Sequence, residues 1–303
     1  MSHTKTRRWS TELTIMAGAV ILLMLPLLGI PVKTYLTLTI AGLAMGMLLF
    51  LIASGVSIIF GLMDVLNFAH GALFAWGAYV GFSVFGWLRE WVEADSVLQN
   101  FGVFLAAILA AMAAVAVLGV LVELIRVFWG PNDEVMTVPL TFRGSWDIFD
   151  IIIAKYRIIC IFIGIVVYAV IQLILKKTKL GIIVRAGVEN IEMVQAMGHN
   201  IFLLFTGVFA VGAGLAALGG LSMSIFSLQV YPDMGSSYLL FAFIGVIIGG
   251  LGSVTGSLVG ALIVGLSYNY VAYLVPWAAA GVNIIIMIVI LLIRPTGLFA
   301  AGK

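Results

Sequence analysis

The chain has 303 residues, of which 63% are hydrophobic and 9% charged, and its mean hydropathy is +1.24. A soluble domain of this length could not hydrate so apolar a surface, so the composition excludes a soluble protein and indicates a membrane protein. The net charge of +2 is small and gives no reason to expect a nucleic-acid partner. The single cysteine, Cys160, lies within an apolar run, which excludes a disulfide framework.

The first apolar run, residues 13–30, follows the basic residues Lys5, Arg7 and Arg8. It is long, and the sequence PVKT after it is not a small-residue cleavage site. We therefore expect an extra, retained N-terminal helix rather than a signal peptide. Its basic flank predicts that the N-terminus is cytoplasmic.

Further apolar runs predict transmembrane helices along the rest of the chain, because such runs can cross ~30 Å of hydrocarbon at ~1.5 Å per residue. They cover residues 37–60, 68–88, 101–122, 158–175, 201–226, 237–249, 255–274 and 281–293. We expect an all-α polytopic membrane protein with about 8–10 transmembrane helices. A single transmembrane domain over residues 1–303 would contain them all.

The charges that flank these runs give a topology that is inconsistent at one place. Lys and Arg at the N-terminus, in residues 176–200 and at the C-terminus (Arg294, Lys303) predict that all three are cytoplasmic and that the crossings are even in number. The apolar runs are odd in number. Tracking from the N-terminus places Arg126 inside, whereas tracking back from residues 176–200 places residues 130–156 outside. We expect a missing crossing or a misassigned span here, or a re-entrant run at residues 237–249.

Residues 176–200, which we call the island, read KKTKLGIIVRAGVENIEMVQAMGHN and separate two apolar runs. They contain four of the 15 basic residues, which predicts a cytoplasmic loop. Val188, Ile191 and Gln195 fall on one helical side, which predicts a short amphipathic helix over residues 182–198 that docks a partner. The alternative is a solvated loop whose charges only set the orientation of the chain.

Particular island residues are expected to shape this helix and its contacts. Gly181 should form the entry turn, and Gly198 with Asn200 the exit, because glycine and asparagine tolerate left-handed backbone. Glu189 and Glu192 are placed to meet basic residues of a partner.

A polar break at residues 61–71, GLMDVLNFAHG, places Asp64, Asn67 and His70 between two apolar runs. Polar groups at membrane depth usually face protein or a water-filled path. Asn67 can cap the helix that starts near Phe68 while His70 bonds a neighbouring backbone, or both can contact the solute. One histidine without a second ligand nearby predicts no metal site.

Glycines recur at a spacing of four in the segment IGVIIGGLGSVTGSLVGAL, residues 244–262. Small residues at this spacing allow helix backbones to approach closely. The glycine-rich run also predicts a helix break, whose exposed amides can line a translocation path. Path lining and helix packing are therefore both open for Gly249, Gly250, Gly252, Ser253, Gly256 and Gly260.

The chain has no sequence pattern of an enzyme. No GxxxxGK[ST] motif is present, so nucleotide binding by that device is excluded. No nucleophile, base or carboxylate group forms a catalytic constellation, and no cofactor is expected.

Four motifs in this order resemble those of branched-chain amino acid ABC transporter permeases. They are NFAHG at residues 67–71, the island pattern G-x3-R-A-x2-E-x6-A-x-G-x-N, GGLGS at residues 249–253 with the two following glycines, and RPTGL at residues 294–298. The island pattern is carried by Gly181, Arg185, Ala186, Glu189, Ala196, Gly198 and Asn200. The resemblance covers roughly residues 37–298 and departs from the family after Arg126, where relatives carry a basic loop and another apolar helix.

The resemblance implies the ABC importer permease fold and a role as the shorter permease subunit of an ATP-driven importer in the bacterial cytoplasmic (inner) membrane. It implies a second, homologous permease subunit, two cytoplasmic ATPases that contact the island, and a periplasmic or extracellular solute-binding protein. Branched-chain amino acids, or related small polar solutes such as urea, amides and aromatic acids, would be the cargo.

The alternative function is a self-sufficient secondary transporter or channel. A secondary transporter would be expected to carry an ionisable coupling residue deep in a span. None is found outside Asp64 to His70.

Overall fold

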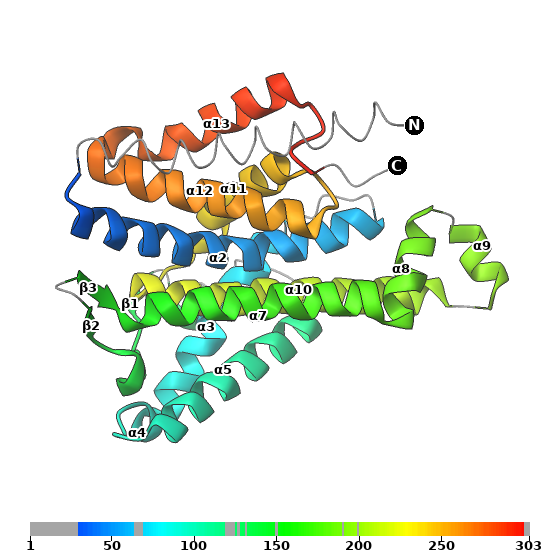
Figure 1. Ribbon diagram of the computed structural model, residues 1–303. Coiled ribbons are helices and arrows are strands. Elements are labelled where there is room, and N and C mark those ends of the chain that lie inside the picture. Colours follow the sequence, from blue (N-terminus) through cyan, green and yellow to red (C-terminus); the bar gives the residue numbers. More distant parts are fainter. Residues whose placement is uncertain are drawn as a thin grey trace.

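The computed structural model describes residues 30–63, 69–118, 125, 128–130, 132–148, 151–189, 191–198 and 200–299. Most of the predicted N-terminal helix, together with Asp64 and Asn67, lies outside these ranges. The described residues form helices joined by short loops, with two small two-stranded sheets (Figure 1).

Long helices form wherever the sequence after residue 30 has an apolar run. They are α2 (Val32–Met63), α3 (His70–Trp87), α5 (Val97–Leu118), α7 (Lys155–Lys177), α10 (Ile201–Ser227), α11 (Met234–Gly249), α12 (Val254–Leu274) and α13 (Ala279–Ile293). Within the described ranges, 6 stretches are long and apolar enough to cross a membrane, and α11 is a shorter apolar helix. The expectation of an all-α polytopic membrane protein is confirmed.

Helix α2 is the centre of the bundle and packs against α12, α10, α7 and α11 (Figure 1). Its middle, residues 48–53, is fully buried. Small residues permit this close packing. A Cβ on Gly46 would lie 2.9 Å from the Leu262 Cα in α12, and one on Gly55 would lie 2.5 Å from the Gly212 oxygen in α10.

The two ends of the bundle differ in what they carry. One end, which we call the island end, carries α8 (Lys179–Glu189) and α9 (Ile191–Ala196), between α7 and α10 (Figure 1). The turn between α11 and α12 lies at the same end, because α2 ends against both: it contacts α8, and Gly61 lies against Gly252. The opposite end, which we call the far end, carries α4 (Arg89–Val92) and both sheets.

The sheets tie the far end together. β1 (Glu134–Val135) pairs antiparallel with β4 (Gln229–Val230), which directly follows α10. β2 (Ser145–Ile148) and β3 (Ile151–Ala154) form an antiparallel pair that leads into α7. Two short 3₁₀ turns, η2 (Leu140–Phe142) and η3 (Pro276–Ala278), complete the described elements.

Between Leu118 and Asn132 the structure describes only residues 125 and 128–130. Helix α5 runs toward the island end, and its 22 residues rise ~33 Å. The Asn100 side chain, near the start of α5, donates to Thr141 Oγ1 over 2.8 Å and accepts from the Leu140 amide over 3.1 Å. Residues 140–141 therefore lie at the far end, whereas Leu118 is at the opposite end of α5. The conflict in the charge pattern falls on the segment between them, most of which lies outside the described residues, and the missing crossing stays a prediction.

Trp129 is one of the described residues of that segment. Its Nε1 donates to Ser83 Oγ in α3 over 2.8 Å, and its ring packs against Trp76 and Tyr79. These contacts place Trp129 against α3.

Candidate functional site

The island is a pair of helices held at a sharp turn after α7. Thr178 separates α7 from α8: its Oγ1 donates to the Ile174 oxygen over 2.6 Å and accepts from the Gly181 amide over 3.2 Å. A Cβ on Gly181 would lie 2.3 Å from the Leu175 oxygen. Gly181 therefore lies inside α8, pressed against the last carbonyl groups of α7, and the expected turn is formed by Thr178 instead.

The exit of the island uses two different backbone conformations. Helix α9 ends at Ala196, and Gly198 has a φ of +84°, which glycine adopts without steric penalty. Asn200 has a φ of −78° and caps α10, because its Oδ1 accepts from the Leu203 amide over 3.2 Å. The left-handed geometry expected of both residues thus occurs at Gly198 only.

The predicted single helix over residues 182–198 is two helices, α8 and α9. Arg185, Ala186 and Glu189 lie on α8, and Glu192 and Ala196 on α9; the side chains of Arg185, Glu189 and Glu192 are outside the described part of the chain.

The short helix α9 presents apolar side chains outward. Val194 is buried and fixes α9 against the protein, whereas Met193 is 62% and Met197 70% exposed. Exposed methionines on a polar loop form an adaptable apolar surface suited to docking a partner.

Polar contacts join the stem of the island to α12. Gln172 Nε2 donates to Thr255 Oγ1 over 3.0 Å, and the Tyr168 hydroxyl lies 3.2 Å from the same oxygen. Tyr168 and Gln172 are one turn apart on α7, just before the island, and Thr255 is in the first turn of α12. These contacts would therefore transmit a movement of the island to the start of α12.

The spaced glycines bring α11 and α12 into backbone contact. A Cβ on Gly256 would lie 2.3 Å from the Gly249 oxygen, and one on Gly249 would lie 2.0 Å from the Gly256 oxygen. Gly260 makes the same approach to Gly245 one turn further on. These residues pack helix against helix, one of the two roles left open by the sequence.

The turn between these helices is bound by the segment that follows α13. Ser253 Oγ caps α12 by accepting from the Gly256 amide over 3.0 Å. The Leu298 amide donates to the Ile248 oxygen over 2.9 Å and the Phe299 amide donates to the Gly249 oxygen over 2.8 Å. We call residues 294–299 the strap. Two motifs separated in sequence, GGLGS and RPTGL, thus form one unit.

The strap packs so closely that one glycine is required in it. Gly297 has a φ of +82°, and a Cβ there would lie 2.6 Å from the Cα of Gly250, which itself has a φ of +106°. No side chain fits between the two backbones.

His70 begins α3 and is completely buried where α2, α3 and α10 meet. A Cβ on Gly55 would lie 2.8 Å from its Nε2. Neither ring nitrogen forms a hydrogen bond with acceptable geometry to the described residues, although the Ile52 backbone is near. The backbone bond of His70 therefore stays a prediction, with the Ile52 backbone as the nearby partner. The residue at the N-cap position is Ala69, whose side chain provides no cap, and Asn67 lies outside the described residues.

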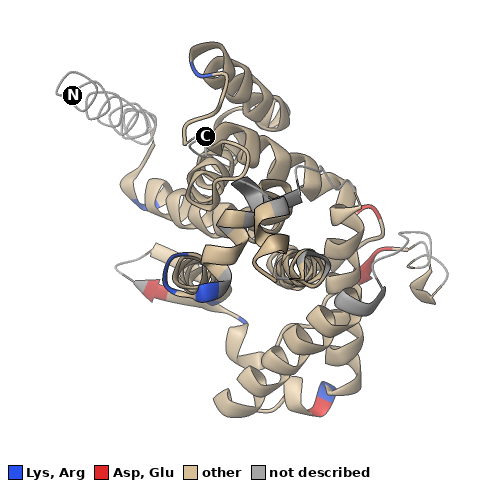
Figure 2. Ribbon diagram, turned by 90° about the vertical axis from the view of Figure 1, so that its right-hand side faces the viewer, with Lys and Arg blue, Asp and Glu red and all other residues tan. Residues whose placement is uncertain are grey.

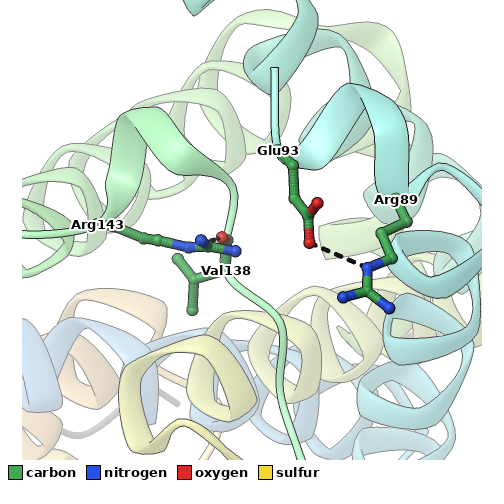
Figure 3. A network of polar contacts seen from close by, with 4 residues as sticks. All are labelled: Arg89, Glu93, Val138 and Arg143. Atoms are coloured by element: carbon green, nitrogen blue, oxygen red, sulfur yellow. Dashed lines mark hydrogen bonds and ion pairs between the residues drawn. The ribbon is translucent and has the colours of Figure 1, made fainter. Parts of the chain in front are cut away.

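The far end carries a group of exposed or half-buried charged side chains. Arg89 Nε pairs with Glu93 Oε1 over 2.9 Å, and Arg143 donates to the Val138 oxygen (Figure 3). Trp87 is 84% exposed beside this pair, as expected of an aromatic residue at a membrane interface.

The structure gathers the predicted site residues into two groups and leaves one apart. The island residues and the glycine turn share the island end, whereas His70 is inside the bundle. Sequence reasoning missed Thr178, although a threonine before a helix is an N-cap signal. It also missed Tyr168 and Gln172, a polar pair at i, i+4 in an apolar helix.

The described residues contain no group of three or more histidine, cysteine or acidic side chains that could hold a metal ion. The site combines exposed apolar side chains, packed glycines and polar contacts between helices.

The sequence matches one protein family over most of its length. The model of the branched-chain amino acid transport system / permease component family matches residues 38–144 and 137–293. No solved structure matches the chain significantly.

Individual relatives agree with this match. The high-affinity branched-chain amino acid transport system permease protein LivH of Escherichia coli (strain K12) is 24% identical over 287 residues, which cover 85% of this chain and 92% of the relative. A LivH of Methanocaldococcus jannaschii, named a probable branched-chain amino acid transport permease, is 27% identical over 305 residues, 95% of this chain and 92% of the relative. The LivM of the same organism, named likewise, is 28% identical over 123 residues, 38% of this chain and 35% of the relative.

With a family model matching more than half of the chain and apolar helices long enough to cross a membrane, this multi-pass membrane protein belongs to the family of branched-chain amino acid transport permease components.

Proposed function

We propose that the chain is a transmembrane permease subunit of an ATP-driven importer for branched-chain amino acids or related small polar solutes. Family membership supports the role of a permease, and the named relatives support the solute class. ATP hydrolysis belongs to separate subunits, because the sequence has no P-loop.

The observation that carries the proposal is the island, a helix pair clamped between two long helices. Helix α7 runs without interruption into the Thr178 turn, and α10 starts at the Asn200 cap directly after α9. A partner that moves α8 and α9 would therefore move both helices, while Tyr168 and Gln172 would transmit the motion to Thr255.

Each end of the bundle has an assigned partner. Two cytoplasmic ATPases dock on the island, with Met193, Met197 and the nearby charges as the contact surface. A periplasmic or extracellular solute-binding protein docks at the far end, and a second, homologous permease subunit completes the membrane part. The occurrence of LivH and LivM relatives in one organism supports that pairing.

The orientation follows from charge. The island carries Lys176, Lys177 and Lys179, so we assign the island end to the cytoplasm of a bacterial inner membrane, with both termini on that side. Single cysteines at Met197 and Asn132 test this assignment, because the native Cys160 is buried and serves as an unreactive background. We expect an impermeant thiol reagent outside intact spheroplasts to label Asn132→Cys and spare Met197→Cys. The reverse pattern would overturn the orientation.

Co-purification tests the proposal as a whole. The tagged chain, expressed with its genomic neighbours, should retain ATPase subunits that carry Walker motifs. Proteoliposomes of the complex should accumulate leucine only when ATP is present inside them. Urea, amides and aromatic acids are the next solutes to test. Uptake by the chain alone, driven by an ion gradient, would instead support the secondary transporter.

A further inference from the structure

A groove of about 420 Å³ opens at the island end between α7, α8 and α10. Its lining is apolar apart from Asn200 and includes Ile174 and Leu175 of α7, Ile183 of α8, and Leu204 and Val208 of α10. At Gly207, also in the lining, an added Cβ would meet nothing within 4 Å. The helices are therefore not packed against each other here, in contrast to the glycine contacts deeper in the bundle.

The groove lies where membrane helices meet the polar island. Ile174 is 40% exposed, and Leu203, in the first turn of α10, is 72% exposed. Apolar side chains exposed at the ends of membrane helices contact the lipid of the adjoining leaflet. The bilayer can therefore supply a lipid acyl chain to the groove at this level.

Three lysines lie beside the groove, close in sequence to its lining. Lys176, Lys177 and Lys179 follow directly on the lining residue Leu175, and all three are exposed. Within the described part of the chain, none of them belongs to an ion pair. Figure 2, which faces the island end, shows the basic residues gathered where α7 meets α8. The described charged side chains beside the groove are therefore basic, and its interior is apolar.

We propose that this groove is a binding site for an anionic phospholipid, with one acyl chain between α7 and α10 and the phosphate on Lys176, Lys177 and Lys179. Basic pockets between membrane helices attract anionic head groups, and lysine stems reach the head-group level while their ammonium groups stay hydrated. An acyl chain in the groove would cover its exposed apolar lining and fill the space between the helices. The bound lipid would brace α8 against α7 and α10.

Native mass spectrometry of the purified full-length chain in mild detergent tests the charge part of the proposal. Phosphatidylglycerol and phosphatidylcholine of identical chains are added separately and bound copies are counted. We expect one phosphatidylglycerol to bind with about tenfold preference. The triple variant Lys176→Gln, Lys177→Gln, Lys179→Gln should lose that preference, and Lys155→Gln, at the other end of α7, should keep it.

A second pair of variants tests the apolar part. Gly207→Phe should fill the groove and remove the bound lipid whichever head group it carries. Gly102→Phe on α5 is the matched control, because a Cβ there also meets nothing within 4 Å, and it should bind lipid as the native chain does. Gly207→Leu serves if the larger side chain prevents folding, with elution from a size-exclusion column as the check.

Three results would overturn the proposal. The first is equal binding of the two lipids by the native chain, and the second is an unchanged preference in the lysine variant. The third is loss of the lipid when the second permease subunit is added, because the groove would then be a protein interface. None of these measurements uses the ATPases, so their outcome is independent of the proposed transport function.

Discussion

Two glycine-containing regions of this protein have opposite environments. Between α11 and α12, a Cβ on Gly256 would lie 2.3 Å from a backbone oxygen, whereas at Gly207 of α10 it would meet nothing within 4 Å. The first region is closed by backbone contact and further bound by the strap. The second is open beside the island. The contrast indicates a rigid unit around the α11–α12 turn and a more adaptable one at the island.

The sequence distinguishes the two regions by what lies four residues away. Gly256 has Gly252, in the turn before α12, and Gly260, on the same side of the helix, at that spacing. Gly207 has Leu203 and Val211 at that spacing. Repeated small residues therefore mark the closed region, although Gly55 shows that a glycine between Leu51 and Ile59 can also reach a neighbouring backbone.

The largest effect is expected when a bulky side chain is placed in the closed region. Gly256→Leu should separate α11 from α12 and prevent folding, because overpacking costs about 1–3 kcal/mol even where atoms can shift, and here the obstacle is backbone. Gly207→Leu is the control and should fold normally. Fluorescence-detected size-exclusion chromatography measures both. Monodisperse Gly256→Leu protein with native transport would show that this side of α12 is not packed.

A smaller effect is expected at the strap. Gly297→Ala adds a Cβ at positive φ, which costs about 1–2 kcal/mol, and also forces it against Gly250. Gly198→Ala is the matched control, since its φ of +84° is nearly the same but its surroundings are open. We expect a lower melting temperature for Gly297→Ala than for Gly198→Ala. Equal melting temperatures would mean that the strap does not bind the α11–α12 turn.

The smallest effects are expected at the helix caps. Ser253→Ala and Asn200→Ala each remove one side-chain acceptor for a backbone amide and should destabilise the chain by about 1 kcal/mol. Ser253→Thr and Asn200→Asp keep an acceptor and should restore stability. Because Asn200 is exposed and water can replace its cap, its loss should be the milder one. If Asn200→Ala lost more stability than Ser253→Ala, the island would be held more rigidly than the open groove beside it indicates.

The positions of the long helices could be predicted because a membrane demands apolar runs with their backbone bonds satisfied internally. The start of α7 at Lys155 precedes the predicted residue 158, because the polar Lys155 and Arg157 lie outside the apolar run. Long basic side chains can extend from a membrane helix to the interface. Hydropathy therefore predicts the ends of membrane helices less well than their middles.

Contacts between distant segments could not be predicted. The pairing of β1 with β4 involves two residues from each strand, too few to leave a pattern in the sequence. The strap and the GGLGS turn were recognised as separate motifs, but nothing in either indicates that they bind each other.

The central claim is that the island couples an ATPase to the membrane helices, and charge reversal at Glu189 tests it most directly. Glu189→Lys keeps the island polar, so a merely solvated loop would tolerate it. Glu90→Lys, an exposed reversal at the far end, is the control for ATPase association. In the reconstituted complex we expect Glu189→Lys to lose ATPase association or the stimulation of ATP hydrolysis by solute, and Glu90→Lys to retain the ATPases. Full transport-coupled hydrolysis by the Glu189→Lys complex would contradict the account.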